Sequence, residues 1–69
     1  MGDIRRKFLA ENKGSYVRLI FANGFQLIGK LVDFDEHDMR VETDAYESSP
    51  VVVPHAAIST YVSASKSKK

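Results

Sequence analysis

The hydrophobic positions at the start of the chain follow the period of a helix. They fall at Ile4, Phe8 and Leu9, with polar residues between them. Spacings of four and five residues place such side chains on one face, so residues 3–12 are expected to form a short amphipathic helix. We expect Asp3 to be its N-cap. The cationic Lys13 and then Gly14, which can adopt the left-handed conformation, are expected to mark its end.

After the helix, the pattern changes to that of β-strands. Residues 16–22 read YVRLIFA, which is rich in β-branched and aromatic residues, and the Asn23-Gly24 pair after them is a strong signal for a hairpin. Residues 25–34 return from this turn, and Gly29 in their middle permits a sharp bend because it has no side chain. A bent strand of this kind helps a small sheet to curl into a barrel.

Three shorter strands complete the pattern. Residues 39–43 continue the meander, and residues 44–50 form a polar loop that ends in proline. The continuous valine run 51–53 places apolar side chains on both faces of a fourth strand, so both faces are expected to be covered. Residues 58–62 form a fifth strand, and the serine- and lysine-rich residues 63–69 are expected to be disordered because they are too polar to pack.

These elements predict an all-β fold: a small SH3-like barrel of five bent antiparallel strands, preceded by a short N-terminal helix. We expect one domain, residues 1–62, with the helix at 3–12, the barrel at 16–62 and the tail at 63–69. A chain of 69 residues hides only about 60% of the surface that its unfolded form exposes. Because the chain has no cysteine, no disulfide can add stability, and association with further copies is the expected source of additional burial.

Composition narrows the chemistry that this barrel can carry. His37 and His55 stand far apart without a metal-ligand pattern around them, so no metal or other cofactor is expected. A nucleophile paired with a base, a glycine-rich phosphate loop and a zinc signature are all missing, which argues against an enzyme. No apolar run approaches the roughly 20 residues that cross a membrane, and the lack of cysteine fits a reducing compartment. A soluble, cytoplasmic protein without a membrane partner is therefore expected.

Charge is unevenly distributed along the chain, although the formal net charge is only +1. Basic residues cluster near the two ends, as Arg5, Arg6 and Lys7 and as Lys66, Lys68 and Lys69. The middle is acidic and contains Asp33, Asp35, Glu36, Asp38, Glu42, Asp44 and Glu47. Even a modest basic cluster becomes a positive belt if it recurs in every copy of an assembly.

Two segments resemble the motifs of a known family. Residues 23–35 read NGFQLIGKLVDFD, which is similar to the N-G-hydrophobic-x-L-x-G-x-hydrophobic-x-x-F-D pattern of the Sm1 motif. Residues 57–61 read AISTY, which is similar to the A-I-S-T core of the bacterial Sm2 motif. Together they resemble the Hfq branch of the Sm-like (LSm) family, and the likeness covers residues 16–62.

The resemblance implies a homo-oligomeric ring in which the fourth strand of one subunit pairs with the fifth strand of its neighbour. A hexamer is favoured, and a pentamer or heptamer is the alternative. The implied interface residues are Val51, Val52, Val53, Ile58, Thr60 and Tyr61. Physical reasoning supports this arrangement, because apolar strand edges are usually covered in soluble proteins.

The resemblance also implies binding of single-stranded RNA, U-rich or A-rich, with one site on the proximal, pore side of the ring. Its candidates are Glu36, His37 and His55. His37 follows the F-D pair and is expected to stack on a base, and a solvated loop histidine is the alternative. Glu36 stands where Hfq usually carries glutamine. His55 occupies a region where the usual lysine-histidine pair is absent, and a plain strand-end residue is the alternative there.

A second implied RNA site lies on the distal side, at the first turn and the second strand. Its candidates are Ile20, Gly24, Phe25, Gln26 and Ile28. Phe25 is either a stacking platform or a core residue, whereas Gln26 has an amide that can pair with adenine. Arg5, Arg6 and Lys7 are the candidates for phosphate contacts, with a merely solvated helix face as the alternative.

Two features of the sequence also fit an alternative function. The acidic middle and the missing lysine-histidine pair also fit a ring that has lost RNA binding and serves as a protein-interaction or structural scaffold. The loop of residues 43–50 is longer than is typical of Hfq, and the sequence offers no functional account of it.

Overall fold

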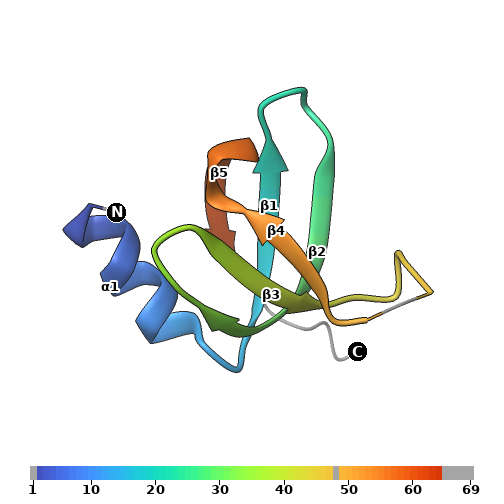
Figure 1. Ribbon diagram of the computed structural model, residues 1–69, viewed down its shortest axis with the longest axis horizontal. Coiled ribbons are helices and arrows are strands. Elements are labelled where there is room, and N and C mark those ends of the chain that lie inside the picture. Colours follow the sequence, from blue (N-terminus) through green and yellow to red (C-terminus); the bar gives the residue numbers. More distant parts are fainter. Residues whose placement is uncertain (1, 48, 65–69) are drawn as a thin grey trace.

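The computed structural model describes residues 2–47 and 49–64, which form one helix and one curled sheet (Figure 1). The elements are α1 (Asp3–Asn12), β1 (Tyr16–Phe21), β2 (Gln26–Phe34), β3 (Asp38–Glu42), β4 (Val51–Pro54), a short 3₁₀ turn (His55–Ala57) and β5 (Ile58–Ser63). All neighbouring strands are antiparallel, in the order β4-β3-β2-β1-β5. The predicted all-β fold with its N-terminal helix is therefore confirmed.

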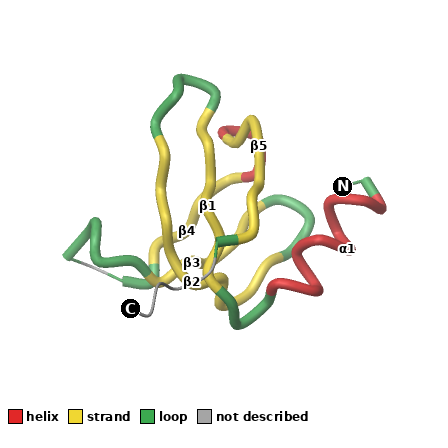
Figure 2. Tube along the Cα trace, turned by 180° about the vertical axis from the view of Figure 1, so that it is seen from behind, coloured by secondary structure: helices red, strands yellow, loops and turns green. Residues whose placement is uncertain are grey.

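The core lies inside the curl of the sheet and is closed on one side by α1 (Figure 2). The strands alternate between buried and exposed side chains, as expected for a sheet with one covered face. Leu9 is the residue of α1 that reaches the core, and it is fully buried. The strands contribute Val17, Leu19, Leu27, Leu31, Met39, Val41, Val53 and Ile58.

Gly29 is needed because β3 passes very close to it. A Cβ atom at this position would lie 2.5 Å from Cγ1 of Val41 and 2.6 Å from the backbone oxygen of Glu42. The pairing of β2 with β3 also shifts its register between Leu31 and Asp33. The bend predicted at Gly29 thus combines a close strand approach with a nearby bulge, which increases local twist.

The ends of α1 differ in part from the prediction. The N-cap is Gly2, in an extended conformation, and Asp3 is the first helical residue, so Asp3 does not serve as the predicted cap. The carbonyl of Gly2 already accepts the first helical hydrogen bond, from Arg6 N–H at 3.0 Å. The other end follows the prediction, because Gly14 has φ of +86° and its N–H donates to the carbonyl of Leu31.

The predicted hairpin is present with a longer turn than an isolated Asn-Gly pair would give. Ile20 pairs with Gln26, and the Phe21 N–H donates to the carbonyl of Phe25 at 2.7 Å. This leaves Ala22, Asn23 and Gly24 as the loop, with Gly24 at φ of +92°. Glycine suits the left-handed position that follows the turn in such hairpins.

Part of the predicted tail is ordered. β5 extends to Ser63, whose hydroxyl donates to Asn12, and Ala64 N–H donates to the carbonyl of Tyr16. The rest of the predicted tail, residues 65–69, lies outside the described residues.

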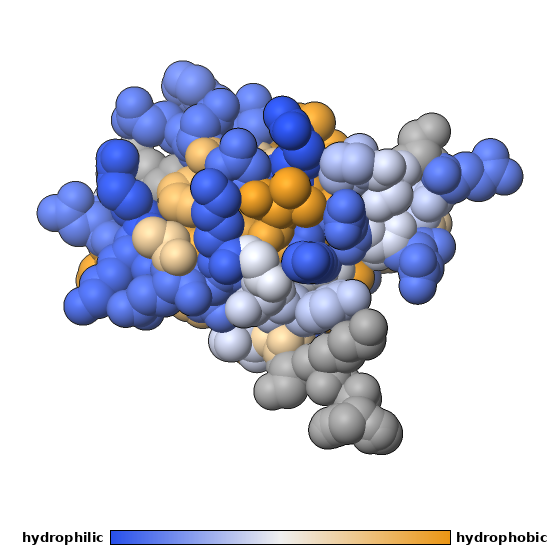
Figure 3. Space-filling view, turned by 90° about the horizontal axis from the view of Figure 1, so that it is seen from below, coloured by the Kyte–Doolittle hydropathy of each residue, from blue (hydrophilic) through white to orange (hydrophobic). Residues whose placement is uncertain are grey.

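The single chain leaves apolar surface exposed. The valine run alternates, since Val53 is 5% exposed whereas Val52 is 65% exposed, so the expected covering of both strand faces is not achieved within one copy. Ile4 is 89% exposed on α1. In the view from below, apolar side chains also reach the surface among hydrophilic ones (Figure 3).

Candidate functional site

The outer side of strands β5, β1 and β2 carries a mixed polar and apolar surface, here called the hairpin face. Leu19 of β1 points into the core, so the residues before and after it point outward. Residues directly opposite each other on paired strands share a face, which gives two outward rows. These rows are Val62–Arg18–Ile28 and Thr60–Ile20–Gln26.

Three large apolar side chains are exposed on or beside this face, and Val62 is the least exposed of them at 37%. Phe25 is 48% exposed and Ile28 is 50% exposed. The Phe25 ring rests against that of Phe21 with centroids 5.5 Å apart, and Asn23 Oδ1 accepts a hydrogen bond from the Phe25 N–H. Phe25 is therefore not a core residue, and the turn holds its ring where a second flat group can contact it.

The polar side chains of the hairpin face are available for a ligand. Arg18, Gln26 and Lys30 are exposed and have no side-chain partner among the described residues. Arg18 and Lys30 were not among the residues singled out from the sequence. Strand alternation could have identified them, because each lies next to buried positions in a strand of period two.

The turn from Asp33 to Asp38 has the opposite character, because its carboxylates serve the backbone. Asp35 Oδ1 accepts hydrogen bonds from the N–H groups of His37 and Asp38, each at 2.8 Å. Asp33 Oδ1 accepts from Phe34 N–H at 2.9 Å and lies 3.5 Å from Lys13 Nζ. The Asp38 and His37 N–H groups lower the pKa of Asp35. The Phe34 N–H and the charge of Lys13 lower the pKa of Asp33.

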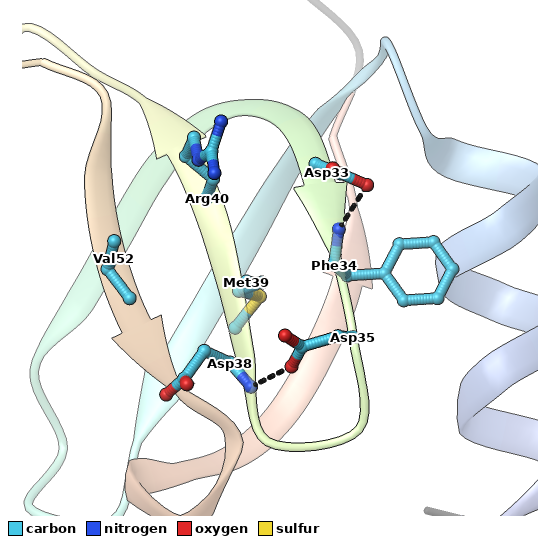
Figure 4. A pocket seen from close by; sticks show the side chains of 7 residues that line it. All are labelled: Asp33, Phe34, Asp35, Asp38, Met39, Arg40 and Val52. Carbon is cyan, nitrogen blue, oxygen red and sulfur yellow. Dashed lines mark hydrogen bonds between the residues drawn. The ribbon is translucent and has the colours of Figure 1, made fainter.

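A small cavity of about 190 Å³ opens beside this turn, over β3 and β4 (Figure 4). We call it the acidic cavity, because Asp33, Asp35 and Asp38 line it together with Arg40, Met39 and Val52. Asp35 is occupied by the backbone, as described above. The Asp38 side chain has no partner among the described residues.

The two histidines predicted for the proximal site are not equivalent. His37 is exposed in the acidic turn, next to the exposed Glu36. His55 is only 4% exposed. Its Nδ1 lies 2.7 Å from the Tyr61 hydroxyl and its Nε2 lies 2.9 Å from the carbonyl of Asp35. A backbone carbonyl can only accept, so Nε2 carries the proton and Nδ1 accepts from the hydroxyl. In this arrangement His55 is a structural residue that offers no free nitrogen to a base.

The basic residues of α1 also point in different directions. The guanidinium of Arg5 stacks over the Tyr61 ring at 5.4 Å, and Phe8 lies on the same ring with centroids 6.3 Å apart. Burial raises the pKa of the Tyr61 hydroxyl. Arg6 and Lys7 are exposed.

A groove of about 510 Å³ lies between α1 and β5, and we call it the helix groove. Its lining includes Ile4, Arg5, Phe8, Ser59, Thr60 and Tyr61. Tyr61 pairs with the buried Leu19 and so faces inward, under α1. Of the predicted interface residues, Thr60 and Tyr61 line this groove, whereas Val52 points outward from the other end of the sheet.

Within the described part of the chain, no helix is long and apolar enough to span a membrane. The described His, Asp and Glu residues form no group of three or more that could hold a metal ion.

Comparison with known proteins finds similarity to solved structures. No family model matches the sequence, and no curated protein matches it. A crystal structure of Hfq, titled as a pleiotropic translational regulator, superposes with a TM-score of 0.76 and 27% sequence identity. The match covers 87% of this chain and 98% of that chain. The chain therefore has an Sm-like fold close to that of Hfq, as its motifs predict.

Proposed function

We propose that this protein is a cytoplasmic, homo-oligomeric ring that binds single-stranded RNA through the hairpin face and does not alter it chemically. The observation that supports this most directly is the combination of exposed apolar and unpartnered polar side chains on β1 and β2. The structural similarity to a translational regulator agrees with it.

The chemistry of the hairpin face suits a single strand. Aromatic side chains offer bases a stacking surface worth on the order of 1–3 kcal/mol per base, and Phe25 presents its ring in this way. Arg18 and Lys30 are exposed cations on β1 and β2 that can neutralise phosphates, which supplies the sequence-independent part of RNA affinity. Gln26 carries the amide that can bond to an adenine edge.

These features favour A-rich over U-rich RNA. The proximal candidates are weak, because His55 is buried and His37 lies among carboxylates that repel phosphates. On the distal side, the proposed path of the RNA follows Gly24, Ile20 and Ile28, and no acidic residue occupies the outward rows there. Arg5, Arg6 and Lys7 would then recur around the ring as a secondary source of positive charge.

The ring itself is proposed from the two edges of the sheet. In the described residues, β4 and β5 each have a strand neighbour on one side only. Unpaired edges with exposed apolar residues such as Val52 invite pairing with another chain. Pairing β4 of each copy with β5 of the next satisfies both edges when the circle closes, and we favour six copies.

Titration of fluorescent oligonucleotides with the full chain tests this function, with native mass spectrometry to count subunits. We expect a ring that binds an A-rich 18-mer more tightly than a U-rich one, and a log affinity that falls linearly with log salt. A ring that fails to bind either oligonucleotide at low salt would contradict RNA binding and support the scaffold alternative. A monomer at micromolar concentration would contradict the ring.

A further inference from the structure

A third outward row lies on the hairpin face, beyond the two described above. Val17 follows Tyr16 on β1 and is fully buried, so Tyr16 points outward. Leu31 follows Lys30 on β2 and is also fully buried, so Lys30 points outward. Tyr16 and Lys30 are directly opposite each other on the paired strands, and their side chains are therefore neighbours.

The position of this row gives the hairpin face an aromatic residue near each end. Outward residues of a strand are two positions apart, which is about 7 Å along the strand. Tyr16 is four positions before Ile20 on β1, so the third row lies about 14 Å from the row next to the hairpin turn (Figure 1). Phe25 lies at the turn itself, and Arg18 lies between the two aromatic residues.

The charged groups beside Tyr16 suit a nucleotide. Lys30 is exposed and has no side-chain partner in the described structure, although Glu42 is directly opposite it on β3. An unpaired cation next to an aromatic ring offers a phosphate and a base one contact each. Glu42, on the far side of Lys30, repels phosphates and so favours a strand that follows β1 and does not cross onto β3.

The Tyr16 ring is held in place before any ligand arrives. β1 lies between β2 and β5 in the sheet, and the carbonyl of Tyr16 accepts a hydrogen bond from Ala64 N–H at 3.0 Å. The side chain is half-buried, so its neighbours restrict the ring. A group that is already ordered loses little conformational freedom when a ligand contacts it.

We propose that Tyr16 and Lys30 form a further nucleotide subsite, in which a base stacks on the Tyr16 ring and a flanking phosphate contacts Lys30. This inference rests on the proposed RNA binding and extends the path of the strand from the turn to the start of β1. Arg18 then contacts the phosphates between the two stacked bases. Because stacking tolerates every base, this subsite adds affinity for any sequence, whereas Gln26 favours adenine.

Single-tryptophan variants of the full chain test the stacking directly, because the chain contains no tryptophan. Tyr16→Trp should bind an A-rich 18-mer within about twofold of the wild-type affinity, and its fluorescence should be quenched as the indole stacks on a base. Tyr46→Trp is the matched control on the loop between β3 and β4, and its fluorescence should not change. Absence of quenching at position 16 in the saturated complex, or equal quenching at both positions, would overturn the subsite.

Affinity measurements by fluorescence anisotropy separate the ring from the charge. Tyr16→Leu should weaken binding of A-rich and U-rich 18-mers alike, by about tenfold, whereas Tyr16→Phe keeps the ring and should stay within about twofold of the wild type. Lys30→Gln should flatten the salt dependence. Lys13→Gln is its control, since Lys13 Nζ already lies 3.5 Å from Asp33 Oδ1, and its salt dependence should match that of the wild type.

The outcomes distinguish this subsite from the RNA binding on which it rests. Native mass spectrometry and thermal denaturation identify any variant that has lost its assembly or its fold, and Tyr16→Trp still reports on the position if Tyr16→Leu is unstable. A folded Tyr16→Leu variant with wild-type affinity would rule out the subsite and leave RNA binding at Phe25 and Arg18 intact. A wild-type protein that binds neither oligonucleotide at low salt would rule out both.

Discussion

The hairpin face and the acidic turn are both exposed and both rich in charge, yet they use their polar groups differently. In the turn, Asp33 and Asp35 accept hydrogen bonds from nearby backbone N–H groups. On the hairpin face, the backbone is satisfied by the strand ladder, and Arg18 and Lys30 have no side-chain partner in the described structure. Exposure alone therefore does not identify a binding surface. The useful criterion is whether an exposed group already has a structural role.

The largest expected effect comes from reversing charge on the hairpin face. Arg18→Glu should lower affinity for an A-rich oligonucleotide on the order of 100-fold at low salt and should flatten the salt dependence, because a phosphate contact becomes a repulsion in every subunit. Fluorescence anisotropy across a salt series measures both quantities.

Arg40→Glu provides the matched control for this variant, since Arg40 is also an exposed arginine on a strand but lies beside the acidic turn. Its effect on RNA affinity should stay below about threefold in rings of equal size. Equal losses for both arginines would remove the distinction between the two regions.

A smaller effect is expected from removing the aromatic ring at the hairpin turn. Phe25→Ala should weaken RNA binding by about tenfold, which is what loss of one stacked base would cost, with little change in thermal stability. Tyr46→Ala is the control, because Tyr46 is 49% exposed, close to the 48% of Phe25, but lies on the loop between β3 and β4. If the two variants bind RNA equally well, Phe25 is not a stacking platform.

The smallest effect concerns the acidic turn and appears as a pH dependence of stability. The pKa of Asp35 is lowered from its ordinary value of 3.8 because the Asp38 and His37 N–H groups donate to the carboxylate. The resulting stabilisation is present above the ordinary pKa and is lost as pH falls through the lowered folded-state pKa.

Asp35→Asn keeps an acceptor oxygen but removes the titrating charge. Its melting temperature should therefore be lower than that of the wild type at about pH 7, and it should fall less between about pH 5 and about pH 2. Thermal denaturation followed by circular dichroism measures this difference. Parallel pH curves for the two proteins would show that the charge of the Asp35 carboxylate does not contribute to stability.

Much of the candidate site follows from the alternation of buried and exposed residues along the strands. The role of His55 does not, because it depends on residues distant in sequence. The exposure of Gln26 and the position of Gly24 could be predicted because they depend on strand period and turn geometry alone. The same period identifies Arg18 and Lys30 as outward-pointing cations, whereas the phosphate contacts predicted from the sequence were the consecutive basic residues of α1. His55 could not be assigned from sequence, because its burial depends on Tyr61 and on the carbonyl of Asp35, 20 positions away.

The sequence by itself determined the elements of this protein, since helix period, strand alternation and glycine turns are local properties of a few neighbouring residues. It also carried the motifs that predict an Sm-like fold. Only the tertiary structure decided which charged groups are free and which support the backbone, because hydrogen bonds and burial depend on residues distant in sequence. The tertiary structure also placed the helix groove and the acidic cavity at opposite edges of one sheet, because the order of the strands determines which strands form the edges.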